Sequence, residues 1–250
     1  MDVTVTVNEA FNRDVLARYP EEACGLVIGG EYHPCTNVHE EPKGAFRIAG
    51  AERIALELKH GPVQAVLHSH PYDIAKSREF ILAKYNPAWA SVPDQKGFMD
   101  DNVPWGIVST DGQGVSDFVW LTDEPRSMER RQFEWFTSDC YAVVRDWYAL
   151  NTNIRLPNFT REWEFWLKGL NIIEEGLETI PFARKLPANE ANVGDMAVFQ
   201  VVGAKVVNHV GVICGDNQLL HIFPNGGYFA HTARWDQWKH KAKYVVRYEP

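Results

Sequence analysis

The 250-residue chain carries 33 Asp and Glu against 25 Lys and Arg, and the acidic excess is confined to one half. Residues 1–123 contain 10 Lys and Arg against 18 Asp and Glu, a net charge of −8, whereas residues 124–250 contain 15 of each. The acidic first half argues against nucleic acid as a partner. No apolar run approaches the length of a membrane span, and the first residues lack a signal-peptide pattern, so we expect no membrane span.

The composition predicts two folded domains. A hydrophobic content of 45% with nine Trp is typical of packed cores, and 250 residues suffice for two ordinary domains. Four scattered Cys without paired spacing are typical of a reducing compartment. We place the boundary near residue 124, where a Pro-containing, charge-rich segment (122–138) begins, and expect an α+β chain divided into residues 1–123 and 124–250.

The first half shows alternating helix and strand signals. Residues 8–18 and 51–59 have amphipathic helical patterns, and 26–30 and 63–70 are apolar runs of strand length. The segment 105–119 predicts a hairpin, with strands at 105–108 and 115–119 on either side of a turn at Asp111 and Gly112.

The strand at 63–70 ends in His68-Ser69-His70-Pro71, a candidate metal site. Residues i and i+2 of a strand point to the same face, so the two imidazoles lie side by side, as a zinc ion requires. Asp94 can complete the ligands, and Glu22 is the candidate base. Such a His pair is also often simply solvated. Ser91 with Asp94 has in addition the pattern of a helix capping box, which is compatible with a ligand role because a cap can hold the ligand rigid.

Three motifs in order resemble the JAMM (Mov34/MPN-type) metalloprotease family. They are Pro20-x-Glu22-x-Cys24-Gly25, then His68 to Pro71, then Ser91-x-x-Asp94. The resemblance implies a mixed sheet with flanking helices. It also implies Zn²⁺ bound by His68, His70 and Asp94, with Glu22 as the base and Ser91 helping to stabilise the oxyanion.

One spacing departs from that family. Residues 72–90 separate Pro71 from Ser91, a longer spacer than is usual there. We interpret this segment as an inserted loop with some helical character.

The second half contains a candidate thiol nucleophile. Cys140 follows good helix N-cap residues, and apolar side chains at 141, 144, 147 and 148 predict a helix beginning at the cysteine. A helix N-terminus lowers a thiol pKa, so we expect a reactive thiolate at neutral pH. Cys24, Cys35 and Cys214 are interpreted as ordinary apolar side chains.

A predicted hairpin supplies the histidine partner. Residues 208–213 and 218–223 predict two strands, with His209 on the first and His221 on the second. A two-residue turn at Asp216 and Asn217 alone would put the two imidazoles on opposite faces. A bulge or a three-residue loop would put them on the same face, which catalysis requires.

Asp139-Cys140, Gly194-Asp195 before a strand, His209-Val-Gly-Val and Leu-Leu-His221 resemble the NlpC/P60 family of papain-like cysteine peptidases. The resemblance implies that Cys140 is the nucleophile, His209 the general base and His221 the residue that orients the base.

The order of the two halves resembles the K-like family of tail tip assembly proteins of lambda-like tailed phages. That resemblance implies amide-bond hydrolysis, with peptidoglycan stem peptides or a tail protein as substrate and other tail tip proteins as partners. It also implies residence in the host cytoplasm during assembly and then at the virion tail tip. A rival hypothesis is a structural tail component whose JAMM fold has lost its metal.

Overall fold

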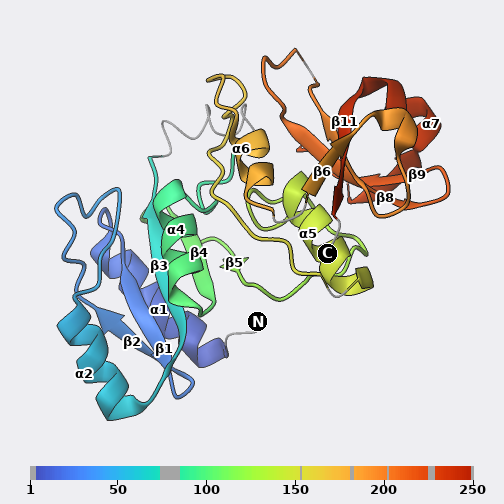
Figure 1. Cartoon of the computed structure of the whole chain (residues 1–250). Coiled ribbons are helices and arrows are strands. Elements are labelled where there is room, and N and C mark those ends of the chain that lie inside the picture. Colours follow the sequence, from blue (N-terminus) through green and yellow to red (C-terminus); the bar gives the residue numbers. More distant parts are fainter. Residues whose placement is uncertain are drawn as a thin grey trace. The chain divides into compact units, whose positions relative to one another are not determined.

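The computed structural model describes residues 4–73, 85–152, 154–180, 183–201, 203–224 and 229–248 (Figure 1). The chain divides into two compact units, Met1–Asp123 and Glu124–Pro250, at the residue where the sequence placed the boundary. Each unit contains its own sheet and helices, so the chain is of the α+β class that the sequence predicts.

The first unit is built on a mixed five-stranded sheet in the order β2-β1-β3-β4-β5. The strands are β1 (Cys24–Ile28), β2 (Glu31–Cys35), β3 (Val63–Pro71), β4 (Trp105–Thr110) and β5 (Val119–Leu121). Only β3 and β4 run parallel, and the other neighbours are antiparallel. The predicted hairpin is β4 and β5, although its second strand begins at Val119, four residues later than expected.

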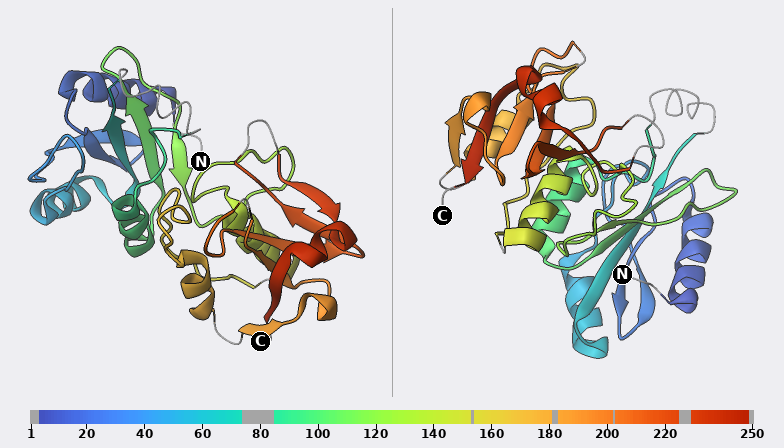
Figure 2. Two further views of the ribbon diagram at one scale, coloured as in Figure 1. Left: turned by 90° about the horizontal axis from the view of Figure 1, so that it is seen from above. Right: turned by 90° about the vertical axis from the view of Figure 1, so that its right-hand side faces the viewer.

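In the described part of this unit, three helices flank the sheet: α1 (Val5–Arg18), α2 (Gly50–His60) and α4 (Val92–Asp101). Helix α1 lies on one face, with α2 and α4 on the other (Figure 2). The alternation of β3 explains this division. Ala65 and Leu67 pack into the core that α1 covers through Phe11, so His68 and His70 face the side of α4.

Helix α4 approaches the sheet closely because Gly97 has no side chain. A Cβ at this position would lie 2.4 Å from the ring of Trp105 on β4. The absence of a side chain brings the first turn of α4 down onto the face that carries the two histidines.

The second unit contains an antiparallel six-stranded sheet in the order β10-β9-β8-β7-β11-β6. Its strands are β6 (Ala183–Leu186), β7 (Met196–Phe199), β8 (His209–Gly215), β9 (Gln218–His221), β10 (His231–Arg234) and β11 (Ala242–Tyr248). Phe199, Ile213 and Val245 belong to the apolar core of this sheet.

The second unit also contains α5 (Cys140–Thr152), α6 (Ile172–Glu178), α7 (Trp235–Trp238) and the short 3-10 helices η1 (Ala188–Glu190) and η2 (Lys239–Lys241). Helix α5 begins at Cys140, as the sequence predicts, and it packs against β8 and β9.

Residues 163–169 form consecutive turns, because Glu164 and Gly169 have positive φ values of 57° and 71° that no helix accommodates. A short helix, α6, and the edge strand β6 follow.

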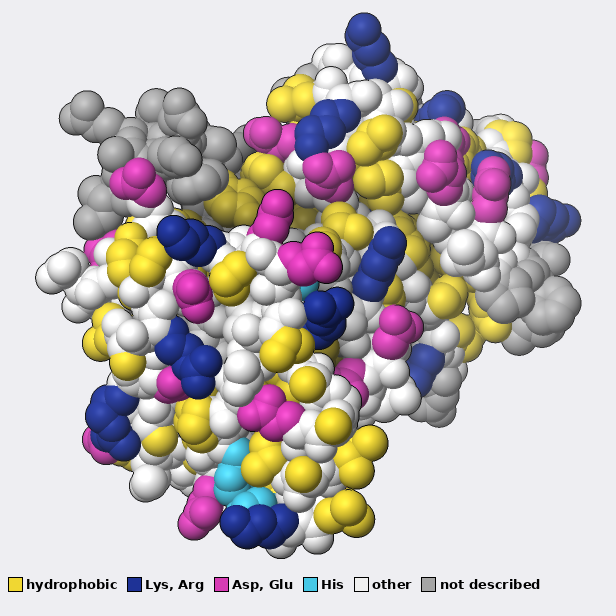
Figure 3. Space-filling view, turned by 90° about the vertical axis from the view of Figure 1, so that its left-hand side faces the viewer, with side chains coloured by type: hydrophobic (Ala, Val, Ile, Leu, Met, Phe, Trp, Pro, Cys, Tyr) yellow, Lys and Arg dark blue, Asp and Glu magenta, His cyan; other side chains and the backbone are white. Residues whose placement is uncertain are grey.

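Within the described residues, no helix combines the length and the apolar character that a membrane span needs. On the face in Figure 3, basic side chains lie among acidic ones, without a continuous field of one sign.

Two candidate active sites

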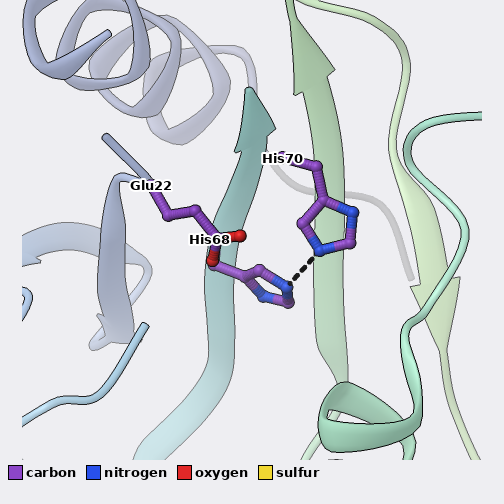
Figure 4. Close-up of side chains that lie close together, drawn as sticks. All are labelled: Glu22, His68 and His70. Carbon is purple, nitrogen blue, oxygen red and sulfur yellow. Dashed lines mark hydrogen bonds between the residues drawn. The ribbon is translucent and has the colours of Figure 1, made fainter. Parts of the chain in front are cut away.

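The first site lies where β3 ends. The two imidazoles of β3 point toward one another and toward Glu22, which precedes β1 (Figure 4). The Nε2 atoms of His68 and His70 are 3.1 Å apart. Each also lies 3.2 Å from a carboxylate oxygen of Asp94, in the first turn of α4.

The contacts among His68, His70 and Asp94, made by Oδ1 to His68 and by Oδ2 to His70, are close to the spacing of zinc ligands, and Glu22, His68 and His70 also form a group whose ligand atoms lie within 4.8 Å of one another. Bonds of about 2.0–2.1 Å to a tetrahedral zinc place neighbouring ligand atoms about 3.3–3.4 Å apart. The ring Nδ1 of His70 lies 2.8 Å from the carbonyl oxygen of Pro87, so this nitrogen carries the proton and donates. In neutral His70 the Nε2 lone pair therefore faces the His68 ring and the carboxylate, an arrangement that a cation would satisfy.

Charge at this site follows from burial and from the short contacts. Burial opposes protonation of His70, but Asp94 outweighs it and, with Glu22 and the Pro87 carbonyl, raises the pKa of His70 to about 9. Burial also opposes ionisation of Asp94, yet the two histidines hold its pKa well below the usual range. Burial lowers the pKa of His68.

Glu22 has the properties of a proton acceptor near the candidate metal site. It is buried, and its carboxylate lies within 4.8 Å of the ligand nitrogens of His68 and His70. Burial and, more weakly, Asp94 raise the pKa of Glu22 to about 7, although His70 opposes the shift. A carboxylate with this pKa can both accept and return a proton near neutral pH.

Ser69 fixes the segment that carries Glu22. Its hydroxyl accepts a hydrogen bond from the Ala23 N–H at 2.9 Å, and its own N–H donates to the Ala23 carbonyl at 3.0 Å. The Glu22 N–H donates in turn to the Pro42 carbonyl at 2.7 Å. Ser69, the residue between the two histidines, thus holds Glu22 beside them, a contact that the sequence analysis missed.

Ser91 occupies the N-cap of α4. Its hydroxyl accepts from the Asp94 N–H, and the Asp94 carboxylate accepts from the Ser91 N–H at 2.7 Å. The capping-box interpretation is therefore confirmed, and the cap fixes the orientation of Asp94. Ser91 is exposed and borders the cavity beside the histidines. Its role toward an oxyanion stays a prediction.

The inserted segment contributes directly to this site. Residues 74–84 lie outside the described residues, so the helical character expected for 72–90 is described only at its ends. At the C-terminal end of the segment, the Pro87 carbonyl orients His70, and Tyr85 packs edge-on against Trp89.

A cavity of about 500 Å³ opens beside the first site. Apolar and aromatic side chains share its wall with the charged residues. Its lining includes Phe46, Ile48, Val66, Tyr72, Tyr85 and Trp105, together with Glu22, His70, Asp94, Lys43, Arg47 and Arg53.

The second site is assembled by α5 and the β8–β9 hairpin. Cys140 is the first residue of α5, and its thiol interacts with the backbone of Val210 on β8, the residue next to His209. The Asp139 carboxylate accepts from the Ala142 N–H at 2.8 Å and so caps the helix, as expected.

The hairpin register resolves the alternative that the sequence left open. Gly215 pairs with Gln218 across the two-residue turn, but the register shifts between Ile213 and Gly215, which makes Cys214 a bulge. The bulge places His209 and His221 on one face, with His209 Nε2 3.0 Å from His221 Nδ1. The same-face requirement is confirmed.

The expected low pKa of Cys140 is wrong. Burial, reinforced by the neighbouring Asp139 carboxylate, raises the pKa of this thiol to about 12, against smaller opposing effects of the Val210 and Tyr141 backbone and of Arg161. The helix N-terminus does not compensate for the lost solvation. Burial, with smaller effects of His221 and His231, lowers the pKa of His209 well below its usual range, so its imidazole is neutral and can accept a proton.

Aromatic side chains enclose the two imidazoles. Phe223 stacks on His209 with ring centroids 4.0 Å apart, and Trp238 meets the His221 ring edge-on at 4.7 Å. His231 pairs with His221 across β10 and β9 and brings a third imidazole to within 4.7 Å of its ring. Only the strand register reveals this proximity.

The comparisons with known proteins fit the second site. The NlpC/P60 family model matches residues 116–247. The chain belongs to the NlpC/P60 family. Membership indicates a thiol-dependent peptidase or hydrolase.

Tail tip assembly protein K of Escherichia phage lambda is a homologue. It is 28% identical over 189 residues, which cover 73% of this chain and 84% of the phage protein. That stretch is longer than residues 124–250 and therefore includes part of the first unit.

Two solved structures are also similar. The NlpC/P60 domain of the peptidoglycan hydrolase SagA is 17% identical and covers 48% of this chain and 89% of its own, with a TM-score of 0.33. A solution structure of a Desulfitobacterium hafniense protein is 20% identical and covers 45% of this chain and 86% of its own, with a TM-score of 0.31.

Proposed function

We propose that the second unit cleaves amide bonds with Cys140 as nucleophile, His209 as general base and His221 as the residue that orients the base. The observation that carries this proposal is the bulged hairpin, which pairs the two imidazoles beside the backbone that contacts the thiol. Family membership supports the same roles.

The charge states define how the thiol reacts. Because Cys140 is a neutral thiol and His209 a neutral imidazole, His209 removes the proton as the sulfur attacks the carbonyl carbon. The resulting imidazolium protonates the leaving amine, and water then hydrolyses the thioester. We assign the Nε2 proton to His209, which donates it to His221 Nδ1 3.0 Å away, so that the Nδ1 lone pair of His209 takes part in this transfer.

We further propose that the first unit is a JAMM-type domain. His68, His70 and Asp94 would hold Zn²⁺, which when bound would supply a Lewis acid and an activated water. Glu22 would carry the proton from that water to the leaving group. Two observations support metal binding by this domain despite the long insertion. The Nε2 atoms of His68 and His70 lie close to each other and to the Asp94 carboxylate, and the Pro87 carbonyl orients the His70 ring.

The homology to a tail tip assembly protein points to a tailed phage. In this proposal the chain works with other tail tip proteins, is made in the host cytoplasm and acts at the virion tail tip. Its substrates are peptidoglycan stem peptides, cut during genome entry, or a tail protein that it processes.

Mass spectrometry of digests tests the substrate and the two sites together. Wild type, Cys140→Ala and Asp94→Ala would each be incubated with peptidoglycan and with tail protein, with and without EDTA. New amines and carboxyls that vanish only in Cys140→Ala assign a bond to the thiol site. Bonds lost in Asp94→Ala or EDTA belong to the metal site. Intact substrates with wild-type protein would leave the chain as a structural tail component.

A further inference from the structure

The turn before the nucleophile, residues 136–139, has a backbone that does not form readily without outside support. Phe136 has a φ of 68°, in the left-handed region that a non-glycine residue rarely adopts. Its N–H donates to the Asp139 carboxylate at 3.1 Å, while the same carboxylate caps α5 at Ala142. The shape of this nucleophile turn therefore determines where Cys140 stands at the start of the helix.

Arg161 holds the turn from one side. Its side chain is 1% exposed, and its five N–H groups each have an acceptor. Three of these bonds reach the turn: Nε and Nη2 contact the Asp139 carboxylate at 2.8 and 3.4 Å, and Nη2 contacts the Phe136 carbonyl at 2.9 Å.

The other two Arg161 bonds and its ring contacts fix the guanidinium itself. Nη1 donates to the Asn158 side chain and to the Phe159 carbonyl. The rings of Phe136, Tyr141 and Phe159 lie around the guanidinium, with centroids 4.9 to 5.2 Å from Cζ.

Arg131 contacts the two remaining residues of the turn, Thr137 and Ser138. Its Nη2 donates to the Thr137 carbonyl at 3.1 Å and its Nε to the Ser138 hydroxyl at 2.7 Å. Nη1 forms an ion pair with Asp146, within α5 itself, at 2.5 Å. The Arg131 guanidinium thus joins the nucleophile turn to α5, the helix that follows the turn.

We propose that Arg161 and Arg131 are positioning residues for Cys140: they clamp the nucleophile turn so that the thiol meets His209 in a reactive geometry. The proposal rests on the thiol function of the second unit. None of the hydrogen bonds given above joins either arginine to the Cys140 thiol or to His209, so each acts through residues 136–139. A misplacement of about 1 Å at a reacting centre can reduce a rate by about 10²-fold, which makes such a clamp consequential.

Replacing Arg161 or Arg131 with lysine tests the geometry of the guanidinium donors separately from the positive charge. Lysine keeps a cation near Asp139 or Asp146 but lacks the planar array of donors that spans the turn. Arg247 provides the matched control. It pairs with Asp195 through two bonds of 2.8 and 2.9 Å in the same unit, and the sheet strand β11 carries it.

The experiment compares Arg161→Lys, Arg131→Lys and Arg247→Lys in the full chain. Measurements are kcat and KM on a soluble stem peptide, the second-order rate of Cys140 alkylation by iodoacetamide, and the thermal unfolding midpoint. We expect kcat and alkylation to fall about tenfold or more in Arg161→Lys and in Arg131→Lys, with KM within about twofold of wild type. In Arg247→Lys we expect kcat and the alkylation rate to stay within about twofold of wild type.

A purely structural role predicts a different pattern. Equal effects of all three variants in proportion to their loss of folded protein would overturn the proposal, as would wild-type rates in both clamp variants. Should Arg161→Lys not fold, Arg131→Lys carries the same test. Alkylation also separates this proposal from the proposed function, because it measures Cys140 geometry even if wild type cleaves no stem peptide.

Discussion

The two units each contain a pair of imidazoles whose nitrogens are about the same distance apart, yet the electrostatics are opposite. His68 and His70 approach to 3.1 Å, and His209 and His221 approach to 3.0 Å. In the first pair the Asp94 carboxylate raises the pKa of His70 to about 9 against the effect of burial. In the second, burial and the neighbouring His231 lower the pKa of His221 to about 4.

The difference shows that a neighbouring carboxylate, and not the spacing of the rings, sets what a histidine pair can do. With Asp94 between them, the first pair attracts a cation, whether a proton or a metal ion. Without that compensation, the second pair stays neutral and can pass a proton from a thiol. Each prediction below removes one part of this contrast.

The largest effect should follow Cys140→Ser. Loss of the nucleophile removes the covalent route, so we expect thiol-dependent cleavage to fall by about 10⁴-fold or more. The rate of product formation from a stem peptide measures this. EDTA serves as the control, since it should leave the wild-type rate of the same cleavage unchanged. Inhibition by EDTA would mean that the two sites are not independent.

Asp94→Ala should release the metal. Removing the carboxylate deletes one ligand and also the anion that balances the cation, so the zinc content should fall from about one ion per chain to background. Elemental analysis after dialysis measures it. The control is Asp100→Ala, an exposed carboxylate on the same helix, which should keep its zinc. Full zinc retention in Asp94→Ala would refute the ligand assignment.

Glu22→Gln should separate metal binding from turnover. Glutamine preserves the shape but cannot accept a proton, so zinc should stay while metal-dependent cleavage falls by about 10²-fold. The readouts are zinc content and the rate of EDTA-sensitive cleavage. Unchanged turnover with zinc in place would exclude Glu22 as the base.

His221→Ala should be milder than His209→Ala. His221 fixes the ring of His209 but carries no proton in the reaction, so we expect kcat to fall by about tenfold, against about 10³-fold for His209→Ala. Both values come from the same stem-peptide assay. Equal losses in the two variants would place His221 in the proton transfer itself.

The smallest effect concerns the pH dependence of the thiol. A group whose pKa is raised to about 12 remains protonated at neutral pH. The rate of Cys140 alkylation should therefore keep rising between about pH 6 and pH 10, beyond the ordinary cysteine pKa of about 8.5. A plateau below pH 7 would show a preformed thiolate and restore the expectation from the helix N-terminus.

The sequence predicted what depends on local pattern. The i, i+2 spacing of His68 and His70 places both rings on one face of β3, and the N-cap residues before Cys140 mark the start of α5. The requirement for an odd hairpin loop even anticipated the bulge at Cys214. Each of these follows from strand or helix periodicity within a few residues.

Contacts between distant segments were beyond such reasoning. Arg161 lies 22 residues from Asp139, and no pattern around it marks a buried guanidinium. The Pro87 carbonyl that orients His70 comes from a segment that the sequence treated only as an insertion. The raised pKa of Cys140 reflects burial, a property of the packed unit that a helix-end argument omits.

X-ray absorption at the zinc edge tests the central contrast most directly, because it reports which histidine pair holds the metal. The protein loaded with about one zinc per chain should show only nitrogen and oxygen neighbours near 2.0–2.1 Å. The spectrum of Cys140→Ser should be the same. A sulfur neighbour near 2.3 Å that disappears in Cys140→Ser would place the zinc at the second site and contradict the account.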